Sequence, residues 1–524
     1  MQGQGAFLCV DIGTSSLKAA YIGTDGTVLA FSRQRYPSHR VMEGTVLASD
    51  WEDAFVRACH ELAEQISFLP TVRGIAISGN GPTLVPITPE GRALAPLHWH
   101  QGKKKEEKCP APGTPISAVK GKRVRASAAE NTGAENTSPS APPRSSAPTE
   151  SGGTSRMERD SSYKAMSVLP AESGGPSLFL PSVLRFSRER PEDFASLAFF
   201  LSPQEYLLWR LGADPVTAIP NERYIPYYWD GPQLEGAGLP ARLFPPFVIM
   251  GTIVGHLSEK AAGPCLLPAG IPLIVGGPDF IMALLGVGVL EEGMVCDRSG
   301  TSEGINLCTA RPIHSSSLRL LPHVRGDKWN LAALLPSTGR LFEWFREITG
   351  QHERDYQEMM REILETPAPK SFFFPEIHGE GSLCLPSAII STAGLTSRAE
   401  LGYAVLEAIG FMVRRGIELL EVQHLRLESM RLSGGQAKNP LWNQMKANIT
   451  GRYLVVPAIE DGELAGNACL ALLASGEAAS LEEAVERMVQ IRRVYEPVQS
   501  EYARFSERYE TYRHLQSKME QFFQ

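Results

Sequence analysis

Short apolar runs alternate with polar turns over the first 36 residues. Phe7–Val10 and Leu17–Ile22 are apolar, residues 11–16 read DIGTSS between them, and Asp25-Gly26 precedes a third apolar run at residues 28–31. An Asp-Gly step between apolar runs is a strong signal for a β-hairpin. The pattern therefore predicts a meander of three antiparallel strands at the N-terminus.

The apolar period then changes to that of a helix. Apolar side chains recur at every third or fourth position, at Trp51, Ala54, Phe55, Ala58, Leu62 and Ile66. This spacing predicts an amphipathic helix, and Asp50 is its expected N-cap because a carboxylate there can accept from the first free backbone N–H groups. Apolar runs at residues 73–78 and 84–87 predict two further strands.

Residues 101–175 interrupt these patterns. The segment begins QGKKKEEK and continues mainly in Ala, Ser, Pro, Thr, Gly and Glu, with few large apolar residues. Such a chain cannot bury enough apolar surface to offset the entropy lost on ordering it. We therefore expect a disordered insertion, whose Lys and Arg cluster is solvated rather than bound to an anionic partner.

Regular patterns return at Leu178. Ser202-Pro203 is a cap followed by a favoured first helical residue, which predicts a helix through EYLLWRL. Aromatic residues then gather at Tyr224, Tyr227, Tyr228 and Trp229. Such side chains can stack on a sugar or fill a junction between domains, and we favour the junction.

The second half of the chain repeats the character of the first. A strand, a turn with a carboxylate and a helix occupy residues 270–286, and two apolar runs flank a Gly-Thr-Ser turn within residues 295–307. Ser397 and Glu400 form a capping box, which predicts a long helix. The remaining elements are expected at residues 429–432 (a strand), 463–474 (a helix of small residues) and from about 480 (a charged helical tail).

The 524 residues exceed what one core can organise, so we expect an α/β protein of two domains. We divide it into residues 1–250, residues 251–490 and a peripheral helical tail at 491–524. The net charge of -7 and the pI near 6.0 argue against a nucleic-acid surface. No apolar stretch is long enough to cross a bilayer, and the eight cysteines form no C-x-x-C pair, which fits reduced thiols in the cytoplasm.

Two turns, one in each half, share a design that suits phosphate. Their residues are Asp11, Gly13, Thr14 and Ser15 in the first half and Gly300, Thr301 and Ser302 in the second. A glycine lets the backbone approach closely, and the following hydroxyl and N–H groups can hold an anion. Asp11 beside a phosphate requires a cation such as Mg²⁺ between them. Either turn alone could be an ordinary hairpin, but the repetition favours a phosphate site.

A third candidate is the loop SGGQAKNP at residues 433–440. Gly434 and Gly435 end a strand without side chains, and Asn439 caps the helix that begins at Pro440. A nucleotide could lie across the glycines, with the small residues around Gly466 admitting a flat base. An ordinary connection from strand to helix would use the same residues. The chain has neither a P-loop nor a G-x-G-x-x-G after a strand.

Asp279 opens the apolar helix that follows the strand at residues 270–278. An aspartate in this place can satisfy free N–H groups of the helix, or it can act chemically. Its position between the two phosphate-binding turns in the chain makes chemistry the better interpretation.

Taken in order, these elements resemble the FGGY family of carbohydrate kinases, with its xylulokinase-like branch, in the superfamily of sugar kinases, heat-shock proteins and actin-like ATPases. The resemblance covers residues 7–100 and 178–475. It implies two actin-like, ribonuclease-H-type α/β domains with a cleft between them, residues 1–250 binding the sugar and 251–490 the nucleotide. It also implies a cytoplasmic enzyme that uses ATP and Mg²⁺ to phosphorylate a hydroxyl of a small sugar, ketose, polyol or sugar acid.

By position, the resemblance implies a magnesium-organising residue at Asp11 and a general base at Asp279. The base would accept a hydrogen bond from the sugar hydroxyl and take its proton late, since phosphoryl transfer depends mainly on positioning and charge neutralisation. The other implied residues are Gly13, Thr14, Ser15, Gly300, Thr301 and Ser302 around the phosphates, and Gly434, Gly435 and Asn439 around the adenosine.

The sugar side of the chain departs from the family. Where xylulose kinases usually show Gln-Met-His and glycerol kinases Gln-Arg-Glu, the chain has Gly79-Asn80-Gly81. The usual Trp-x-Asp-x-Arg is represented by residues 99–103 (WHQGK), without the aspartate and the arginine. Asn80, Gly81 and Asp279 are the expected contacts to the substrate, whose identity these departures leave open.

Two other functions stay open on the sequence. A catalytically weakened relative that binds sugar or nucleotide as a sensor or partner protein would explain the altered sugar loop and the insertion. A non-sugar ATPase of the actin or chaperone type would share the two domains but would not need Asp279. The intact Asp11, Asp279 and Gly-Thr-Ser turns favour the kinase, and the oligomeric state is open.

Overall fold

The structure is a computed structural model of the 524-residue chain. The residues that it describes are 5–67, 70–98, 177–300, 303–335, 338–375, 377–378, 384–385, 387–391, 394, 397–421 and 426–522. The expected insertion at 101–175 and the turn residues Thr301 and Ser302 lie outside the described residues.

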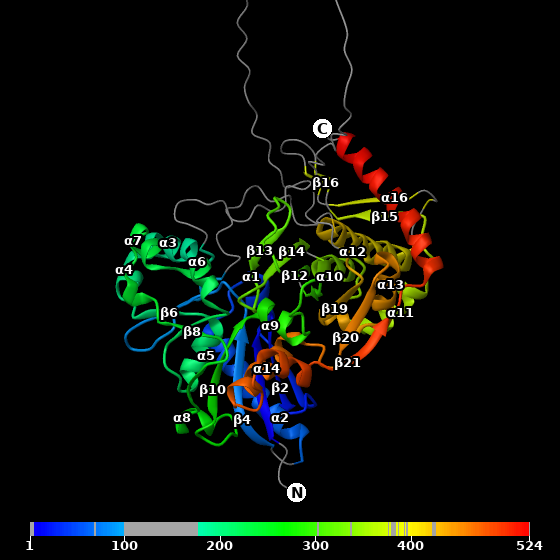
Figure 1. The fold of residues 1–524 in the computed structure, drawn as a ribbon. Coiled ribbons are helices and arrows are strands. Elements are labelled where there is room, and N and C mark those ends of the chain that lie inside the picture. The colour runs from blue at the N-terminus through cyan, green and yellow to red at the C-terminus, as the bar shows by residue number, and fades with distance from the viewer. Residues whose placement is uncertain are drawn as a thin grey trace, which may run out of the picture.

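A six-stranded sheet organises the first half, in the order β3-β2-β1-β4-β10-β9 (Figure 1). Its strands are β1 (Gly5–Ile12), β2 (Ser16–Gly23), β3 (Val28–Arg35), β4 (Thr71–Gly79), β9 (Ile253–His256) and β10 (Pro272–Pro278). The antiparallel pairing of β1, β2 and β3 confirms the predicted meander, and β4 runs parallel to β1. The sheet extends past the boundary expected at residue 250, because the apolar strand β10 pairs with β4.

A seven-stranded sheet organises the second half, in the order β13-β14-β12-β11-β19-β20-β21. Its strands are β11 (Val295–Ser299), β12 (Glu303–Thr309), β13 (Arg319–Pro322), β14 (Trp329–Leu335), β19 (Ser429–Gly434), β20 (Tyr453–Pro457) and β21 (Ile491–Tyr495). β11 repeats the role of β1, antiparallel to β12 and parallel to β19. Both sheets end in an antiparallel pair, β10 with β9 and β20 with β21. The two halves therefore share one pairing pattern.

The shared pattern relates individual residues at the ends of the central strands. Asp11 lies opposite Ser78 on the parallel strand β4, and Arg298 lies opposite Ser433 on the parallel strand β19. Each of Asp11 and Arg298 also stands two residues before the glycine of its Gly-Thr-Ser turn. Arg298 thus occupies in the second sheet the position that Asp11 occupies in the first.

Helix α2 (Ala48–Gln65) covers one face of the first sheet and begins earlier than predicted. Asp50 is its third residue and Leu47 is its N-cap, so the predicted cap was wrong by three residues. The Asp50 carboxylate accepts from the Leu47 N–H at 2.8 Å and binds Arg40 at 2.7 Å. The carboxylate still satisfies a free N–H group at the helix start, but from inside the first turn.

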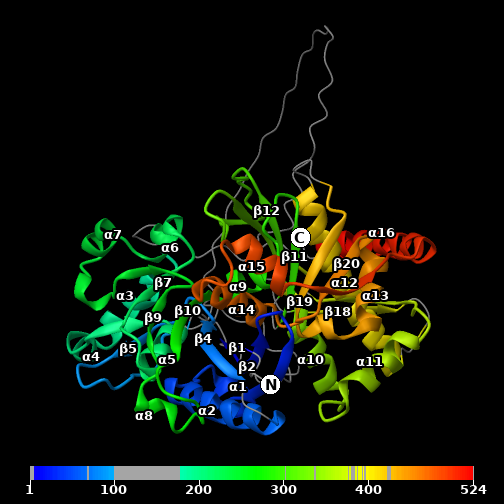
Figure 2. The ribbon, with the colours of Figure 1, turned by 60° about the horizontal axis from the view of Figure 1, so that its bottom comes forward.

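A smaller group of elements stands beside the first sheet in both views (Figures 1 and 2). The group contains β5 (Val85–Ile87), α3 (Leu180–Glu189), α4 (Pro191–Ala195), β6 (Phe199–Leu201), α5 (Pro203–Leu211), β7 (Thr217–Ile219), η2 (Glu222–Tyr224), α6 (Ile225–Tyr228), α7 (Gly231–Gly236), η3 (Ala241–Leu243), β8 (Phe247–Ile249) and α8 (Glu259–Ala262). Helix α1 (Ser38–Glu43) precedes α2 in the chain and is separate from this group. The helix predicted after Ser202 is α5, and Ser202 and Glu205 form its capping box.

The aromatic cluster fills a junction, as predicted. Tyr224, Tyr228 and Trp229 are buried, and they share a core with Leu321 and Val324 of the second half. The Tyr224 hydroxyl donates to the carbonyl oxygen of Pro322 at 2.6 Å. These side chains connect the first half to β13 and its following loop.

Helices α12 (Arg398–Glu421) and α13 (Pro440–Thr450) cover one face of the second sheet. Ser397 and Glu400 exchange hydrogen bonds at 2.7 and 3.2 Å, which confirms the predicted capping box. The other elements here are α10 (Thr338–Ile348), α11 (Tyr356–Glu365), η4 (Gly435–Lys438), α15 (Leu481–Met488), β15 (Ser371–Phe374), β16 (Ile377–His378), β17 (Cys384–Leu385) and β18 (Ala388–Ser391). In the described part of the chain no helix is both long and apolar enough to cross a membrane.

The C-terminal tail is neither wholly helical nor peripheral, contrary to the prediction. Residues 491–495 form the edge strand β21, and α16 (Gln499–Phe522) buries Phe505, Tyr509 and Tyr512 in the core under α12. Arg508 of α16 binds the buried Glu407 of α12 at 2.5 Å. The aromatic spacing in α16 explains the contact, because all three rings share one face of the helix.

Helices α9 (Asp279–Gly286) and α14 (Gly462–Ala474) pack closely against each other between the two halves, because glycines stand at their contact. A Cβ on Gly286 of α9 would meet the Gly462 carbonyl oxygen at 1.8 Å, and one on Gly466 of α14 would meet that of Met282 at 2.3 Å. The small residues around Gly466 therefore serve helix contact, and the prediction that they admit a flat base was wrong. α14 also contacts β1 and β4, so a C-terminal helix completes the core of the first sheet.

Candidate active site

A buried aspartate stands where β1 ends. Asp11 is 2% exposed, and its Oδ1 accepts a hydrogen bond from Ser78 Oγ at 3.0 Å. Burial first, and then the negative charge of Glu463, raise the pKa of Asp11 to about 7, although Lys18 acts in the opposite direction. An additional cation next to this carboxylate would favour its ionised form.

Lys18 of β2 connects Asp11 to the start of α14. Its Nζ lies 3.1 Å from Asp461 Oδ1, 3.6 Å from Glu463 Oε2 and 3.8 Å from Asp11 Oδ2. Lys438 also binds Asp461, at 2.9 Å. Sequence reasoning missed these charged residues, since hundreds of positions separate Lys18 from its partners on α14 and no short motif contains them.

Asp279 is the first residue of α9 and faces β11. Its Oδ1 accepts from the Phe280 N–H at 2.7 Å, and its Oδ2 accepts from Arg298 Nη2 at 2.8 Å. Arg298 Nε also donates to Glu463 Oε1 at 3.2 Å. The Asp279 side chain is 21% exposed. The carboxylate therefore holds one helical N–H and one cation while part of it stays open to a ligand.

The carboxylates at this junction outnumber the cations. The acids are Asp11, Asp279, Asp461 and Glu463, and the cations in contact with them are Lys18, Arg298 and Lys438. One negative charge is uncompensated when all of these groups are ionised. Within the described ranges, no group of three or more His, Cys, Asp or Glu side chains is arranged to hold a metal ion by itself.

The first Gly-Thr-Ser turn lies beside the expected sugar loop. The Gly13 N–H donates to the Ser16 carbonyl oxygen at 3.0 Å, which closes the turn and leaves Thr14 and Ser15 exposed. Asn80 Nδ2 donates to Thr14 Oγ1 at 3.3 Å. The structure thus brings together an expected phosphate residue and an expected substrate residue. In the second turn Gly300 is exposed.

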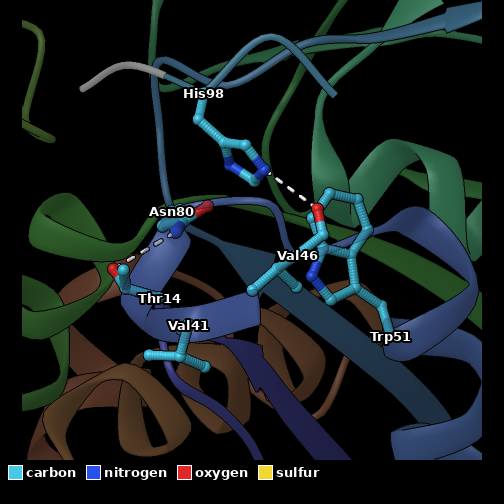
Figure 3. Close-up of a pocket in the computed structure, with 8 residues that line it drawn as sticks. Thr14, Val41, Val46, Trp51, Asn80 and His98 are labelled. Atoms are coloured by element: carbon cyan, nitrogen blue, oxygen red, sulfur yellow. Dashed lines mark hydrogen bonds between the residues drawn. The ribbon is translucent and has the colours of Figure 1, made fainter. Parts of the chain in front are cut away.

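A pocket opens next to these two side chains (Figure 3). Thr14 and Asn80 form one wall, and Val41, Val46, Trp51 and His98 contribute to the others. His98 Nε2 donates to the Val46 carbonyl oxygen at 2.9 Å, while the buried Asn80 Oδ1 has no hydrogen-bond partner among the residues that the structure describes. Gly81 follows Asn80 in the same loop, and a Cβ there would meet open space. Sequence reasoning missed His98 and Trp51, which no motif marks.

The expected nucleotide loop contains glycines of two kinds. Gly434 has φ +97°, and a Cβ on it would lie 2.0 Å from the Ser299 carbonyl oxygen. The close approach of the neighbouring strand β11 therefore already excludes a side chain there. Gly435 has no atom of the described residues within 4 Å of such a Cβ, which leaves space for a ligand on that side. Asn439 is buried; its Oδ1 caps α13, as predicted, and its Nδ2 donates to Gln357 Oε1 at 3.0 Å.

A second charged cluster lies beneath the second Gly-Thr-Ser turn. Lys446 of α13 is 1% exposed, and its Nζ lies 2.7 Å from both Asp297 Oδ2 and Glu303 Oε1. Burial, followed by the charge of Asp297, raises the pKa of Glu303 to about 8. Asp297 and Glu303 belong to the two strands that flank the turn, so Lys446 ties these strands together. The sequence analysis did not identify this cluster.

Comparisons with known proteins find similarity to carbohydrate kinases. Residues 298–475 match the model of the C-terminal domain of the FGGY family of carbohydrate kinases. The chain is 24% identical over 532 residues to a xylulose kinase of Escherichia coli K12, covering 98% of this chain and 99% of that protein. It is 26% identical to an autoinducer-2 kinase of Salmonella paratyphi B over 52% of this chain and 56% of that protein, so the match spans about half the length of that relative.

The fold is that of two-domain sugar kinases with actin-like α/β domains. A ligand-bound xylulose kinase from Lactobacillus acidophilus superposes with a TM-score of 0.71 at 17% identity, covering 98% of both chains. The Plasmodium falciparum glycerol kinase with ADP superposes with a TM-score of 0.65 at 14% identity, covering 96% of this chain and 98% of that one. At these identities the similarity establishes the architecture.

Proposed function

We propose that the protein, whose residues 298–475 match the model of the C-terminal domain of the FGGY family of carbohydrate kinases, transfers the γ-phosphoryl group of ATP to a hydroxyl of a small sugar or polyol. The observation that carries the proposal is the partly exposed Asp279 carboxylate at the junction of the halves. Arg298, on the strand that leads into one expected phosphate turn, binds Asp279, and Lys18 connects the same charged group to Asp11 before the other turn.

Asp279 is the proposed general base. Its oxygens already accept from the Phe280 N–H and from Arg298, and each oxygen keeps a further lone pair for a substrate hydroxyl. A carboxylate fixed in this way can align the hydroxyl with the phosphorus atom and receive its proton as the new bond forms. Positioning and charge neutralisation supply most of the acceleration in phosphoryl transfer, so a fixed acceptor suits this role.

Asp11 is the residue that would hold Mg²⁺, together with phosphate oxygens of the nucleotide. The excess negative charge at the junction, and the burial of Asp11, fit a divalent cation. Magnesium sites of this kind need only one or two carboxylates, since the phosphates and water complete the coordination. When bound, the ion neutralises charge on the phosphates. Gly13, Thr14 and Ser15, with Gly300, Thr301 and Ser302, are the proposed phosphate contacts.

Gly434, Gly435 and Asn439 are proposed to border the adenosine. Of these, Gly435 has the open space for direct contact, while Asn439 supports the loop by capping α13. On the other side of the junction, Asn80 and Gly81 are proposed to bind the sugar, because the unpartnered Asn80 Oδ1 can accept from a hydroxyl. The buried, unpaired cysteines of the described residues fit the cytoplasm, where ATP is supplied.

The test is ADP release by the purified protein across a panel of ketoses, polyols and sugar acids, with Asp279→Asn beside the wild type. We expect one class of sugar to stimulate ADP release, and Asp279→Asn to lower kcat by about 1,000-fold or more while ATP still binds, since general-base removal costs about 100- to 10,000-fold. Asp230→Asn, which changes the N-cap of α7 in the group of elements beside the first sheet, is the matched control. Sugar binding without turnover would instead favour a sensor protein, and hydrolysis unaffected by sugars would favour an actin-type ATPase.

A further inference from the structure

Arg298 stands at the position of the second sheet that is equivalent to Asp11 in the first. Both residues precede the glycine of their turn by two positions, and both lie opposite a serine of the parallel neighbour, Ser78 or Ser433. The strand that leads into the first turn therefore carries a negative charge at this position, and the strand that leads into the second turn carries a positive one. A carboxylate in this position suits a cation, whereas a guanidinium suits an anion.

Arg298 uses its guanidinium to join two helices through carboxylates. Nη2 donates to Asp279 Oδ2 on α9 at 2.8 Å, and Nε donates to Glu463 Oε1 on α14 at 3.2 Å. The planar fork of an arginine holds its partners in a fixed direction, which a lysine does not. The side chain is 27% exposed, so it borders the junction rather than the core.

Glu463 has a second cation besides Arg298. Lys18 already lies 3.6 Å from the other oxygen of that carboxylate. Among the residues that the structure describes, Arg298 is the one cation within salt-bridge distance of Asp279. Glu463 therefore acts as a fixed anchor for the guanidinium, and the guanidinium in turn fixes Asp279.

From this geometry we propose that Arg298 is a positioning residue for phosphoryl transfer, which orients the Asp279 carboxylate toward the acceptor hydroxyl. The inference rests on the proposed function and deepens it at the same site. Asp279 Oδ1 is held by its own helix and Oδ2 by Arg298, so both oxygens have fixed directions before a substrate arrives. Without the guanidinium, the carboxylate turns about its terminal bond and loses alignment with the hydroxyl.

Arg431 provides a matched control on the neighbouring strand. It binds the opposite end of the same helix α9, through the carbonyl oxygens of Val287 and Gly288 at 2.6 and 3.2 Å, and it touches neither Asp279 nor Glu463. Arg431→Met therefore removes an arginine that anchors α9 without disturbing the carboxylate.

The experiment compares Arg298→Met, Arg298→Lys, Glu463→Gln and Arg431→Met with the wild type in sugar-stimulated ADP release. We expect Arg298→Met to lower kcat by about 100-fold, as a small misplacement of a reacting group does, with KM for ATP changed less than about twofold. Arg298→Lys and Glu463→Gln should lose less, and added guanidinium ion should restore part of the kcat of Arg298→Met but not of Arg431→Met. Thermal unfolding of each variant separates misplacement from loss of the fold.

The outcomes distinguish the two proposals. A wild-type protein without sugar-stimulated ADP release overturns both the kinase and the role of Arg298. A wild-type protein that turns over, together with Arg298→Met that matches Arg431→Met in kcat or shows no response to guanidinium, overturns the role of Arg298 alone and leaves the kinase standing. Partial activity in Arg298→Lys keeps the test decisive even if Arg298→Met fails to fold.

Discussion

The two halves of the molecule share a pairing pattern but use their charged residues differently. In the first half Asp11 and Lys18 lie at the junction, where Lys18 is 15% exposed and shares its partners with other cations. In the second half Asp297 and Glu303 enclose Lys446 with almost no exposure. A buried cluster fixes a turn, whereas an accessible one can exchange partners with a ligand. The same sheet scaffold can therefore either fix a turn or bind a ligand, depending on which face of the central strand carries the charge.

Strand geometry explains how the charges come to lie on different faces. Side chains alternate along a strand, and Asp297 precedes its turn glycine by three residues, whereas Asp11 precedes its own by two. Asp297 thus points away from the junction, to Lys446, and Arg298 takes the place toward it. The one-residue offset replaces a carboxylate by a guanidinium at the site.

Replacing Lys446 and Lys18 separately should give the largest difference between the two charged clusters. Lys446→Met leaves two buried carboxylates without their cation, and we expect it to lower the free energy of unfolding by about 3–5 kcal/mol. Lys18→Met should cost less stability, since Lys438 also binds Asp461 and Arg298 also binds Glu463, but it should impair sugar-stimulated ADP release more. Urea unfolding and the ADP assay measure the two effects. Combining Lys446→Met with Asp297→Asn and Glu303→Gln should recover much of the stability, and equal losses in both lysine variants would contradict the distinction.

The glycines that end β4 and β19 give a second contrast. Gly434→Ala combines a φ of +97° with a Cβ 2.0 Å from the Ser299 backbone, and we expect a loss of about 2–3 kcal/mol. Gly79→Ala places its Cβ 2.7 Å from Gln204 Oε1, the far end of a side chain that can move, so a loss of about 1 kcal/mol is expected. Thermal unfolding of the two variants measures the difference. A more damaging Gly79→Ala would show that the two strand ends are constrained in the opposite order.

Acidification should act in opposite directions on two buried groups, His323 in the second half and Glu205 in the first. Burial lowers the pKa of His323 to about 4, so its contribution to stability is present above pH 6.5 and is lost as the pH falls toward 4. Burial raises the pKa of Glu205 to about 7, so its contribution is present below pH 4.5 and is lost as the pH rises through 7. From pH 7 to 5 each effect amounts to about 2 kcal/mol at most, since one pKa unit corresponds to about 1.4 kcal/mol.

Urea midpoints at pH 5 and pH 7 measure these effects in the wild type, His323→Gln and Glu205→Gln. We expect His323→Gln to lose the destabilisation by acid and Glu205→Gln to lose the stabilisation by acid. The same pH dependence in both variants and the wild type would mean that neither buried group governs the response.

Local features of the fold could be predicted from the sequence, because neighbouring residues determine them. The hairpin at Asp25-Gly26 and the caps at Ser397 and Asn439 need only a few positions to be recognised, and the structure confirms them. Asp50 shows the limit of such reasoning: a carboxylate can satisfy a helix start from the cap or from the first turn, and the N-cap lies three residues before the predicted one.

The contacts that make the site could not be predicted, since they join distant parts of the chain. Arg298 is 19 residues from Asp279 and 165 residues from Glu463. No local pattern marks an arginine inside an apolar strand as a partner for both. Gly466 shows the same problem in reverse: its small neighbourhood fits a ligand or a helix equally well, and only the position of α9 decides between them.

The placement of α14 has a consequence for how the protein is made. The apolar face of the first sheet, including Phe7, Cys9 and Ala76, is completed by Leu464 and Ala468 of α14. During synthesis from the N-terminus, that face stays without its covering helix until nearly nine-tenths of the 524 residues have left the ribosome. The first sheet is synthesised before the second, but its covering helix follows all strands of the second sheet except β21, so a nascent chain must keep the first sheet from aggregating while most of the second forms.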